Sequence, residues 1–467
     1  MKTSSNSFLY ELRNLLREDQ VSTNETILDH HSKDESYHKA SRPDVVVFPE
    51  STEEVQAIIK IADAHHTAVT PFGLGSSLEG HAIPYNQGLT IDFSSMNQVL
   101  EVREKDFLVR VQPGVTRSQL NEKLKKHGLF FSVDPGADAT LGGMAATNAS
   151  GTTSVKYGVM RDQVQSLEVV SPDGKVIHTG NLARKSSSGL HLNSLYVGSE
   201  GTLGCITELT LRVYGIPEQI VAGRASFPSV DHAVEAVVSI LQAGIPIARV
   251  ELVDESSIRQ VNSFNGTDYK EKPTLFLEFH GNEAGLNQDV DFAKDIVADH
   301  DCEGIQFEGD SAGRNKLWEA RHNLAYAYIH GNPGRSLMVT DVCVPLSELA
   351  GAIKYGRENI ETLGFEAGIL GHVGDGNYHA LLMVDANDSE EMKRAERFNE
   401  AIVEDALSRG GTCTGEHGVG LGKMKYMEKE HGDALHVMES IKDSLDPKGI
   451  MNPDKLVHKR RQENENT

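Results

Sequence analysis

Apolar and polar residues alternate along the chain with the periods of strands and helices. Residues 44–66 begin with a run of valines, which is typical of a buried strand, and continue with apolar side chains at helical spacing. Ser51 and Glu54 fit the capping box that starts such a helix. Short strands are predicted next at 67–72, 88–93 and 106–112, with Gly-dense loops at 134–151 and 198–204. The pattern predicts a mixed α and β domain up to about residue 216.

From about residue 218 the pattern changes to long amphipathic helices that alternate with apolar strands. The helices are predicted at 229–243, 284–299, 311–330, 345–363 and 388–409, and the strands at 220–227, 247–253, 274–280, 336–344, 366–373 and 378–384. Because no Gly-rich phosphate loop interrupts this alternation, it predicts a second α+β domain. The expected organisation is an N-terminal helical segment at 1–40, a first domain at 41–217, a second at 218–429, a final segment at 430–457 and a disordered charged tail at 458–467.

The chain carries a formal net charge of −23, from Lys+Arg 45 against Asp+Glu 68. Nucleic acids and anionic membranes bind basic surfaces, so this balance argues against both as partners. The N-terminal stretch is a candidate amphipathic helix and not a signal peptide, and no apolar run reaches the length of a transmembrane helix. The four cysteines lie far apart, which excludes a Cys₄ iron–sulfur cluster within the chain and argues against a disulfide scaffold. We expect a cytoplasmic protein, with peripheral attachment at the inner face of the membrane as the alternative.

Glycine-rich loops are the first candidates for chemistry. The loop 73–80 follows a strand, and its glycines would let main-chain N–H groups turn towards a phosphate. Its spacing is G-x-G-x-x-x-x-G and a strand follows it, so it is not a dinucleotide-binding fingerprint; taken alone, it fits a plain surface turn. The stretches 134–151 and 198–204 are also built of small residues, which allow the main chain to approach a flat polar group. Three such loops in one region favour a bound nucleotide-like cofactor.

Three histidines and a glutamate form the second candidate. His372 and His379 flank a Gly-Asp-Gly-Asn turn between two apolar runs, and this turn can bring both imidazoles to one side. Glu416 and His417 lie in another glycine-flanked loop. Two imidazoles and one carboxylate with open positions are a common ligand set of catalytic metals, although each histidine alone fits a satisfied loop residue. Arg321 suits a bound carboxylate, but taken alone it fits a solvated helix face better.

Nine motifs occur in an order that carries a family resemblance. They are PFGLGSSLEG, VQPGVT, DPGADATLGGMAATNASGTTSVKYGVMRD, VGSEGTLGCIT, LWEARHN, TDVCVP, GHVGDGNYH, GTCTGEHGVG and MNP. Together they resemble the FAD-linked D-2-hydroxyacid dehydrogenases of the vanillyl-alcohol-oxidase superfamily, most of all the cytochrome-linked D-lactate dehydrogenases and then the glycolate oxidase subunits. The resemblance implies an α+β fold. It would consist of a two-lobed PCMH-type FAD-binding domain, an α+β substrate (cap) domain with an antiparallel sheet, and a C-terminal segment at 430–457 that returns to the FAD domain.

The resemblance also implies site residues. His372, His379 and Glu416 would bind a divalent metal, Zn²⁺ or Mn²⁺, His417 would be the catalytic base, and Arg321 would bind the substrate carboxylate. The FAD would be noncovalent, because the first glycine loop has no histidine where relatives with covalent flavin have one. The implied FAD contacts are Pro71, Gly73, Gly75, Ser76, Ser77, Asp134, Pro135, Gly136, Thr140, Gly142, Gly143, Asn148, Gly151, Thr152, Glu200, Gly201, Ile206 and Asn452.

The implied reaction is the oxidation of a D-2-hydroxy monocarboxylic acid, D-lactate first, to the 2-oxo acid by metal-assisted hydride transfer to flavin N5. Relatives acting on D-2-hydroxyglutarate look to have polar residues where this chain has Leu381, Val339 and Ala325, and apolar residues cannot satisfy a second buried carboxylate. Electrons would leave to a quinone, a cytochrome or a partner subunit, and a homodimer is also expected. The alternatives are a glycolate oxidase-type FAD subunit, a redox-neutral flavin-dependent transferase, a flavin-free metal hydrolase and a non-catalytic FAD-binding subunit.

Overall fold

The computed structural model describes residues 2–457, so the predicted tail at 458–467 lies outside the described residues. The chain folds into two compact units. The first comprises the residues up to 150, 159–216 and those from 416 onwards, and the second comprises 151–158 and 217–415. The chain therefore enters the second unit twice and leaves it finally at Glu416, ahead of the segment predicted to return at 430. The early return has a local cause, since the main-chain N–H groups of Val419 and Gly420 donate to Glu200 of the first unit.

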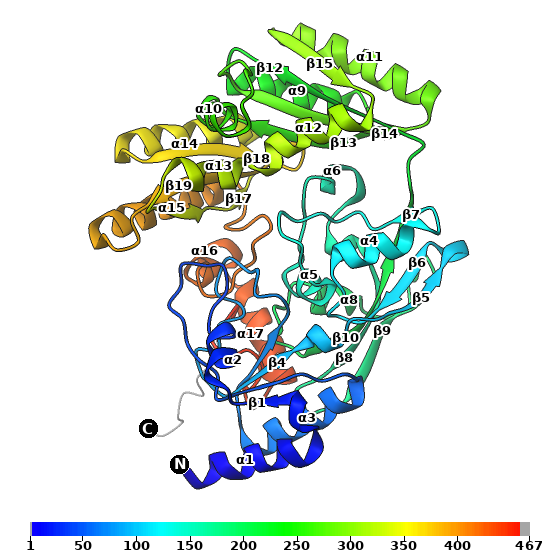
Figure 1. Cartoon of the computed structure of the whole chain (residues 1–467), viewed down its shortest axis with the longest axis vertical. Helices are drawn as coiled ribbons and strands as arrows, with labels where there is room; N and C mark the ends of the chain where they lie inside the picture. The colour runs from blue at the N-terminus through cyan, green and yellow to red at the C-terminus, as the bar shows by residue number, and fades with distance from the viewer. Residues whose placement is uncertain (1, 458–467) are drawn as a thin grey trace. The chain divides into compact units, whose positions relative to one another are not determined.

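The first unit begins with a small sheet of order β1-β2-β4-β3, of which β1 and β4 are labelled in Figure 1. Its strands are β1 (Val21–Ser22), β2 (Val45–Val47), β3 (Val69–Phe72) and β4 (Leu89–Asp92), and its helices are α1 (Lys2–Leu15), α2 (Glu25–His30) and α3 (Thr52–His65). Ser51 caps α3 by accepting from the Glu54 N–H, as the sequence predicts. Side chains of α1 and α3 pack on β2, β3 and β4 to form one hydrophobic core.

A second sheet of the first unit is antiparallel, with order β5-β6-β10-β8-β9. Its strands are β5 (Val99–Arg103), β6 (Leu108–Val111), β8 (Val164–Val170), β9 (Val176–Gly180) and β10 (Cys205–Arg212), with β7 (Leu129–Phe130) and β11 (Tyr214–Gly215) paired beside it. The helices here are α4 (Arg117–Lys125), α5 (Leu141–Thr147), α7 (Met160–Gln163) and α8 (Asn193–Tyr196).

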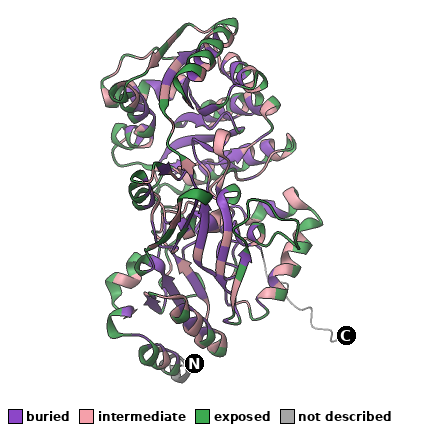
Figure 2. Cartoon of the chain, turned by 90° about the vertical axis from the view of Figure 1, so that its right-hand side faces the viewer, coloured by how far each residue is buried: buried purple, intermediate pink, exposed green. Residues whose placement is uncertain are grey.

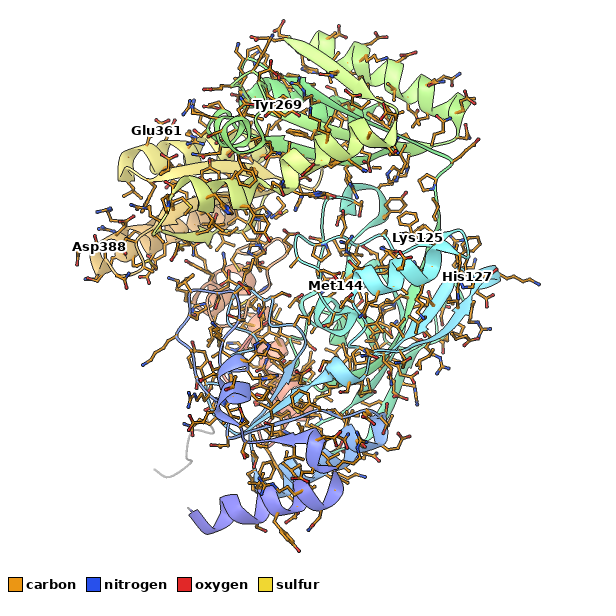
Figure 3. All side chains as sticks on the ribbon, in the orientation of Figure 1. Lys125, His127, Met144, Tyr269, Glu361 and Asp388 are labelled. Atoms are coloured by element: carbon orange, nitrogen blue, oxygen red, sulfur yellow. The ribbon has the colours of Figure 1, made fainter. Side chains whose placement is uncertain are left out.

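Helix α5 corrects the sequence interpretation, which placed its residues in a loop. Thr140 caps it by accepting from the Gly143 N–H, and Asn148 ends it in the left-handed conformation. Its apolar face, which includes Leu141 and Met144 (labelled in Figure 3), lies in the core beside the second sheet. Burial of this face offsets the roughly 1 kcal/mol that each glycine costs within a helix.

The second unit is an antiparallel sheet of order β15-β12-β14-β13-β18-β19-β16, with β17 also paired to β19. The strands are β12 (Gln219–Ser226), β13 (Ile247–Val253), β14 (Thr274–Gly281), β15 (Gly304–Glu308), β16 (Ser336–Val339), β17 (Val342–Cys343), β18 (Glu366–Gly371) and β19 (Asn377–Val384). Figure 2 shows these strands mostly buried and the outer faces of the helices exposed. The predicted antiparallel sheet is thus present.

The helices of the second unit agree in part with the predicted ones. They are α6 (Ser154–Tyr157), α9 (Val230–Gln242), α10 (Glu255–Asn265), α11 (Glu283–Asp299), α12 (Ser311–His322), α13 (Leu324–Gly331), α14 (Leu349–Leu363) and α15 (Ser389–Ser408). The helix predicted at 311–330 is two helices separated at Asn323. Sequence reasoning missed α10 and strand β15, because α10 buries only Ser257, Ile258 and Val261 and its other residues are mostly polar.

The C-terminal part holds the first unit together. Helices α16 (Met427–His431) and α17 (Ala434–Leu445) precede residues 450–452, which run beside β3. The buried Lys442 ammonium donates to Asp446 and to the carbonyls of Thr202 and Met451. Among the helices of residues 2–457, none has the length and apolar composition needed to cross a membrane.

Candidate functional site

The glycine loops of the first unit lie against one another. A Cβ atom added at Gly73 would be 2.4 Å from Thr140 Oγ1, and one at Gly201 would be 2.9 Å from Pro71 Cγ. These approaches bring the loop after β3 against the cap of α5 and the loop 198–204 against β3. A side chain at either position would clash with these atoms, so the packing of the loops requires glycine. The loops therefore pack on one another, and their use as a cradle for a cofactor stays a prediction.

The Glu200 side chain binds the protein's own main chain. Its buried carboxylate accepts from the N–H groups of Val419 (2.7 Å) and Gly420 (2.9 Å) and lies 3.2 Å from His81 Nε2. Burial alone would raise the pKa of Glu200, but the positive charge of His81 and the hydrogen bonds outweigh it and lower that pKa. Asn452 donates to the Glu200 carbonyl. The Glu200 side chain thus holds the loop that carries Glu416 and His417.

The other predicted cofactor residues lie in varied surroundings. Ile206 is buried in the hydrophobic core of the first unit. Asn148 accepts from the Arg161 N–H, and Ser77 donates to Asp34. Gly151 and Thr152 belong to the short segment grouped with the second unit. The partly or fully exposed remainder consists of Gly75, Ser76, Asp134, Pro135, Gly136, Gly142 and Gly143.

A β-hairpin in the second unit brings the two predicted metal-ligating histidines together. His379 lies on β19 directly opposite Leu370 of β18, and His372 follows β18 in the turn. The turn closes through Gly376, whose φ of 81° favours glycine. The two imidazole centroids are 5.5 Å apart. Glu416 comes one peptide bond after the end of the second unit, and one ligand atom each of His372, His379 and Glu416 lie within 4.8 Å of one another.

Hydrogen bonds set which nitrogen of each imidazole is left for a metal. His379 Nδ1 lies 2.9 Å from the Thr340 carbonyl, which can only accept, so this nitrogen carries the hydrogen. His372 Nδ1 lies 2.6 Å from Glu251 Oε1, and an ionised carboxylate can also only accept, so Nδ1 of His372 carries the hydrogen too. Nε2 is then the ligating atom of both. Ser150 donates to Glu416 Oε2 at 2.7 Å. Two imidazoles held in place by these hydrogen bonds, together with an orienting bond to the carboxylate, fit a divalent cation such as Zn²⁺ or Mn²⁺, which binds imidazole in its neutral form.

Arg321 is buried, so the interpretation that it lies on a solvated helix face is wrong. Its side chain comes from the end of α12, and the residue is 9% exposed. Nη2 donates to Glu251 Oε2 at 2.7 Å, while the buried Nε has no hydrogen-bond partner within the part of the chain that the structure describes. An unpaired buried N–H is costly, and a bound carboxylate would satisfy it. The environment of Arg321 therefore suits the carboxylate-binding role implied by the resemblance.

Glu251 is the site residue that sequence reasoning missed. It lies on β13 with no solvent exposure, and its two oxygens bind His372 and Arg321 separately. Burial alone would raise the pKa of Glu251, but the charges of His372 and Arg321 lower it below its usual range. The strand sequence IARVELV offered one signal. Arg249 and Glu251 stand two residues apart in an apolar strand, so they share one face.

Comparisons with known proteins now identify the family. A family described as "FAD linked oxidases, C-terminal domain" matches residues 216–456, and one described as "FAD binding domain" matches residues 43–180. The chain belongs to the FAD-linked oxidase family. It is an FAD-dependent oxidoreductase, and we call the first unit the flavin unit and the second unit the cap unit.

Named relatives in the FAD-linked oxidase family cover most of the chain. A Danio rerio protein named "Probable D-lactate dehydrogenase, mitochondrial" is 45% identical over 95% of this chain and 90% of its own. The "D-lactate dehydrogenase [cytochrome], mitochondrial" of Arabidopsis thaliana is 42% identical, over 96% of this chain and 79% of its own. "Glycolate oxidase subunit GlcD" of Bacillus subtilis is 33% identical, over 92% of both chains.

The fold of the family member is the predicted PCMH type. A solved structure of p-cresol methylhydroxylase with substrate bound matches with a TM-score of 0.79, covering 97% of this chain and 96% of that chain. The sequence identity is 18%, so this likeness shows the fold alone. Together with the two antiparallel sheets and their helices, it confirms the α+β class expected from the sequence.

Apolar residues occupy the cap-unit positions at which the sequence suggested a choice of substrate. Val339 of β16 and Leu381 of β19 are directly paired across the sheet. Leu381 lies in the same hydrophobic cluster as Trp318 and Leu317 of α12, and Val339 packs against it. Ala325 is on the next helix, α13. Within this oxidase, these side chains offer no hydrogen-bonding group to a second carboxylate.

His417 lies in the loop that Glu200 holds. It follows Glu416, is half-buried, and precedes Gly418. A Cβ atom at Gly418 would be 2.7 Å from His81 Nε2 and 2.8 Å from Glu200 Oε1, so the loop packs closely on that buried pair. The flavin unit thus fixes the main chain directly after the predicted base.

Proposed function

We propose that this protein is an FAD-dependent dehydrogenase that oxidises D-lactate to pyruvate with the help of a divalent metal. The observation that carries the proposal is the gathering of His372, His379 and Glu416 within ligand distance, in a member of the FAD-linked oxidase family. Relatives named as D-lactate dehydrogenases, at 42–45% identity over most of the chain, support the choice of substrate.

The residues divide the work of the reaction. Bound FAD supplies the acceptor for the two electrons that leave Cα with its hydrogen. A divalent cation held by His372, His379 and Glu416 supplies Lewis-acid stabilisation of negative charge on oxygen. Arg321 binds and orients the substrate carboxylate. His417 takes the proton of the 2-hydroxyl group, so that proton and hydride leave the substrate separately and a 2-oxo acid remains.

The cap unit favours a monocarboxylate. The apolar pair of Val339 and Leu381 would leave a second carboxylate unpaired, which costs several kcal/mol. A methyl group, as in D-lactate, carries no such cost. We therefore expect D-lactate and other short aliphatic 2-hydroxy acids to be oxidised in preference to D-2-hydroxyglutarate.

Glycolate is the second candidate substrate. The relative named as a glycolate oxidase subunit supports it, and glycolate also carries a single carboxylate. In that case the protein would act as the FAD subunit of a larger complex. For either substrate we propose a cytochrome, a quinone or a partner subunit as the electron acceptor. The cytoplasmic location and the homodimer stay predictions.

Anaerobic reduction of the flavin tests the function. The purified FAD-loaded protein is mixed with D-lactate, L-lactate, glycolate or D-2-hydroxyglutarate, and flavin absorbance is followed before and after metal removal by a chelator. We expect rapid bleaching with D-lactate, slow or no bleaching with L-lactate and D-2-hydroxyglutarate, and loss of the reaction on metal removal. Faster bleaching with glycolate would favour the second candidate. Absence of bleaching with every acid would favour a redox-neutral flavin enzyme and overturn the proposal.

A further inference from the structure

Two buried glutamates on neighbouring strands of the cap sheet each lie between a histidine and an arginine. Glu251 on β13 accepts from His372 Nδ1 and from Arg321 Nη2. On β14, Glu278 Oε1 lies 2.7 Å from His280 Nε2 and 3.5 Å from Arg249 Nε. We call each glutamate with its histidine and arginine a set. The two sets contain the same residue types, both glutamates are buried, and both stand on the same sheet, so the differences between the sets show what each one does.

The two sets differ at the remaining nitrogen of the histidine. His280 Nδ1 lies 2.9 Å from the hydroxyl of Tyr157, which donates to it, so both ring nitrogens are used within the cap unit. His372 Nδ1 is taken by Glu251, and its Nε2 belongs to the candidate metal site. Likewise, the buried Nε of Arg321 finds no partner among residues 2–457. Glu278 therefore joins two side chains that serve the cap unit itself, whereas Glu251 joins a candidate metal ligand to an arginine suited to a substrate carboxylate.

We propose that Glu251 is a positioning residue that couples metal binding by His372 to substrate binding by Arg321. Oε1 holds His372 in the tautomer that ligates through Nε2, and Oε2 fixes the guanidinium that receives the substrate carboxylate. One rigid, fully buried carboxylate thereby sets the placement of two groups that different ligands use. This inference rests on the proposed function and adds to it a shared support of the metal ligand and the carboxylate receptor.

A carboxylate is required at this position because both partners are donors. An ionised glutamate accepts at both oxygens, whereas a glutamine has one acceptor oxygen and one donor nitrogen. In Glu251→Gln, either His372 or Arg321 must therefore face an N–H group. If His372 faces it, the imidazole favours the tautomer with hydrogen on Nε2, which cannot ligate. Loss of such orienting partners typically weakens metal binding by roughly 10–100-fold.

The experiment compares Glu251→Gln with the matched control Glu278→Gln in the FAD-loaded, full-length protein. Zn²⁺ affinity is measured by competition with a chelator, and kcat and KM for D-lactate are measured at saturating Zn²⁺. We expect Glu251→Gln to weaken Zn²⁺ binding by about 10–100-fold and to raise the KM for D-lactate by about 10-fold. Glu278→Gln should leave the Zn²⁺ affinity within about twofold of wild type, although both variants lower the thermal midpoint.

A second variant covers the case in which Glu251→Gln does not fold. Arg321→Lys keeps the positive charge beside Glu251 but loses the planar fork that fixes the carboxylate. If Glu251 couples the two groups, this variant should weaken Zn²⁺ binding several-fold although Arg321 is not a metal ligand. A merely structural role of Glu251 predicts unchanged Zn²⁺ affinity in Arg321→Lys.

The outcomes separate the two claims. Wild-type protein that binds Zn²⁺ and is reduced by D-lactate, together with Glu251→Gln or Arg321→Lys of unchanged Zn²⁺ affinity, overturns the coupling and leaves the proposed function standing. Wild-type protein that binds neither Zn²⁺ nor Mn²⁺ overturns the metal-assisted function and the coupling together. Equal loss of Zn²⁺ affinity in Glu251→Gln and Glu278→Gln would show a general effect of core destabilisation and also overturn the coupling.

Discussion

The candidate site of the flavin unit is built mainly from main-chain segments, whereas that of the cap unit is built mainly from buried side chains. In the flavin unit, glycines such as Gly73 and Gly201 bring main-chain segments into contact, and the Glu200 side chain serves to hold another loop. In the cap unit, buried side chains stand on the strands of an antiparallel sheet, and Glu251 ties His372 and Arg321 together. The flavin unit thus depends on close main-chain packing at glycines, and the cap unit depends on buried side chains whose hydrogen-bond donors and acceptors match.

This contrast implies that metal binding and FAD binding can be lost independently of each other. Removing a ligating side chain should spoil metal binding without releasing FAD. Filling the space beside a glycine should weaken FAD binding without disturbing the imidazoles. Measuring FAD content and metal affinity on the same variants is therefore the direct way to test the contrast.

The largest effect is expected for His379→Ala in the cap unit. The variant removes one of the two imidazoles, so the divalent metal should be lost and turnover of D-lactate should fall by about 1000-fold or more, because a Lewis acid contributes several kcal/mol. Flavin absorbance should stay at the wild-type level. Metal analysis, flavin content and steady-state rates check this. Near-normal turnover by the metal-free variant would refute the role of the site.

Arg321→Lys should have the next largest effect. Lysine keeps the charge but not the two-pronged geometry that matches a carboxylate, so KM for D-lactate should rise by about 10–100-fold, with a smaller fall in kcat. An uncharged short alcohol, which has no carboxylate to bind, should show no such change. If KM for D-lactate is unaltered, Arg321 is not the carboxylate receptor.

Gly73→Ala tests the design of the flavin unit. The new Cβ would lie 2.4 Å from Thr140 Oγ1, so the cap of α5 must shift. Loss of such a cap costs about 1 kcal/mol, and we expect FAD affinity to fall by about 10-fold while Zn²⁺ affinity is unchanged. Gly215→Ala is the matched control in the same unit, because a Cβ there meets nothing within 4 Å. Equal FAD affinity in both variants would contradict the proposed cradle.

The same contrast explains how much of the molecule the sequence could predict. Long amphipathic helices of the cap unit were predicted closely, as for α9, because one strong apolar stripe defines each of them. The His372–His379 pair was predicted because both residues flank one turn. Glu251 was not predicted, because its partners Arg321 and His372 lie 70 and 121 positions away in the sequence. No local sequence pattern indicates such long-range contacts.

The flavin unit was harder to predict where a stretch rich in small residues forms a helix and not a loop. The stretch 141–147 contains two glycines and was assigned to a loop, yet it forms α5 because its Leu141 and Met144 side chains reach the core. Glu200 was predicted as a cofactor contact by its motif, and only the fold shows its carboxylate on the loop 416–420. Motifs therefore located the residues, while tertiary contacts decided what their side chains do.

The smallest expected effect is a pH-dependent loss of stability in His81→Gln. Burial alone would lower the pKa of His81, but the carboxylates of Glu200, Glu79 and Asp34 outweigh it and raise that pKa above its ordinary value of 6.5. The pKa of Glu200 is lowered below 4.5. Stability from the pair is then complete between about pH 4.5 and 6.5, and it is lost as pH rises through the raised pKa of His81 or falls through the lowered pKa of Glu200.

The thermal midpoint of FAD release, followed by flavin fluorescence, measures this effect in the flavin unit. At pH 6 the wild type should be more stable than His81→Gln by about 1–2 kcal/mol, and the difference should shrink at high pH, where His81 is neutral. The pKa of the nearby His38 is lowered chiefly by burial, which is the opposite direction to His81, so His38 should not produce the same trend. A difference that grows with pH would mean that His81 is buried in its neutral form, and that the loop beside His417 is held by Glu200 alone.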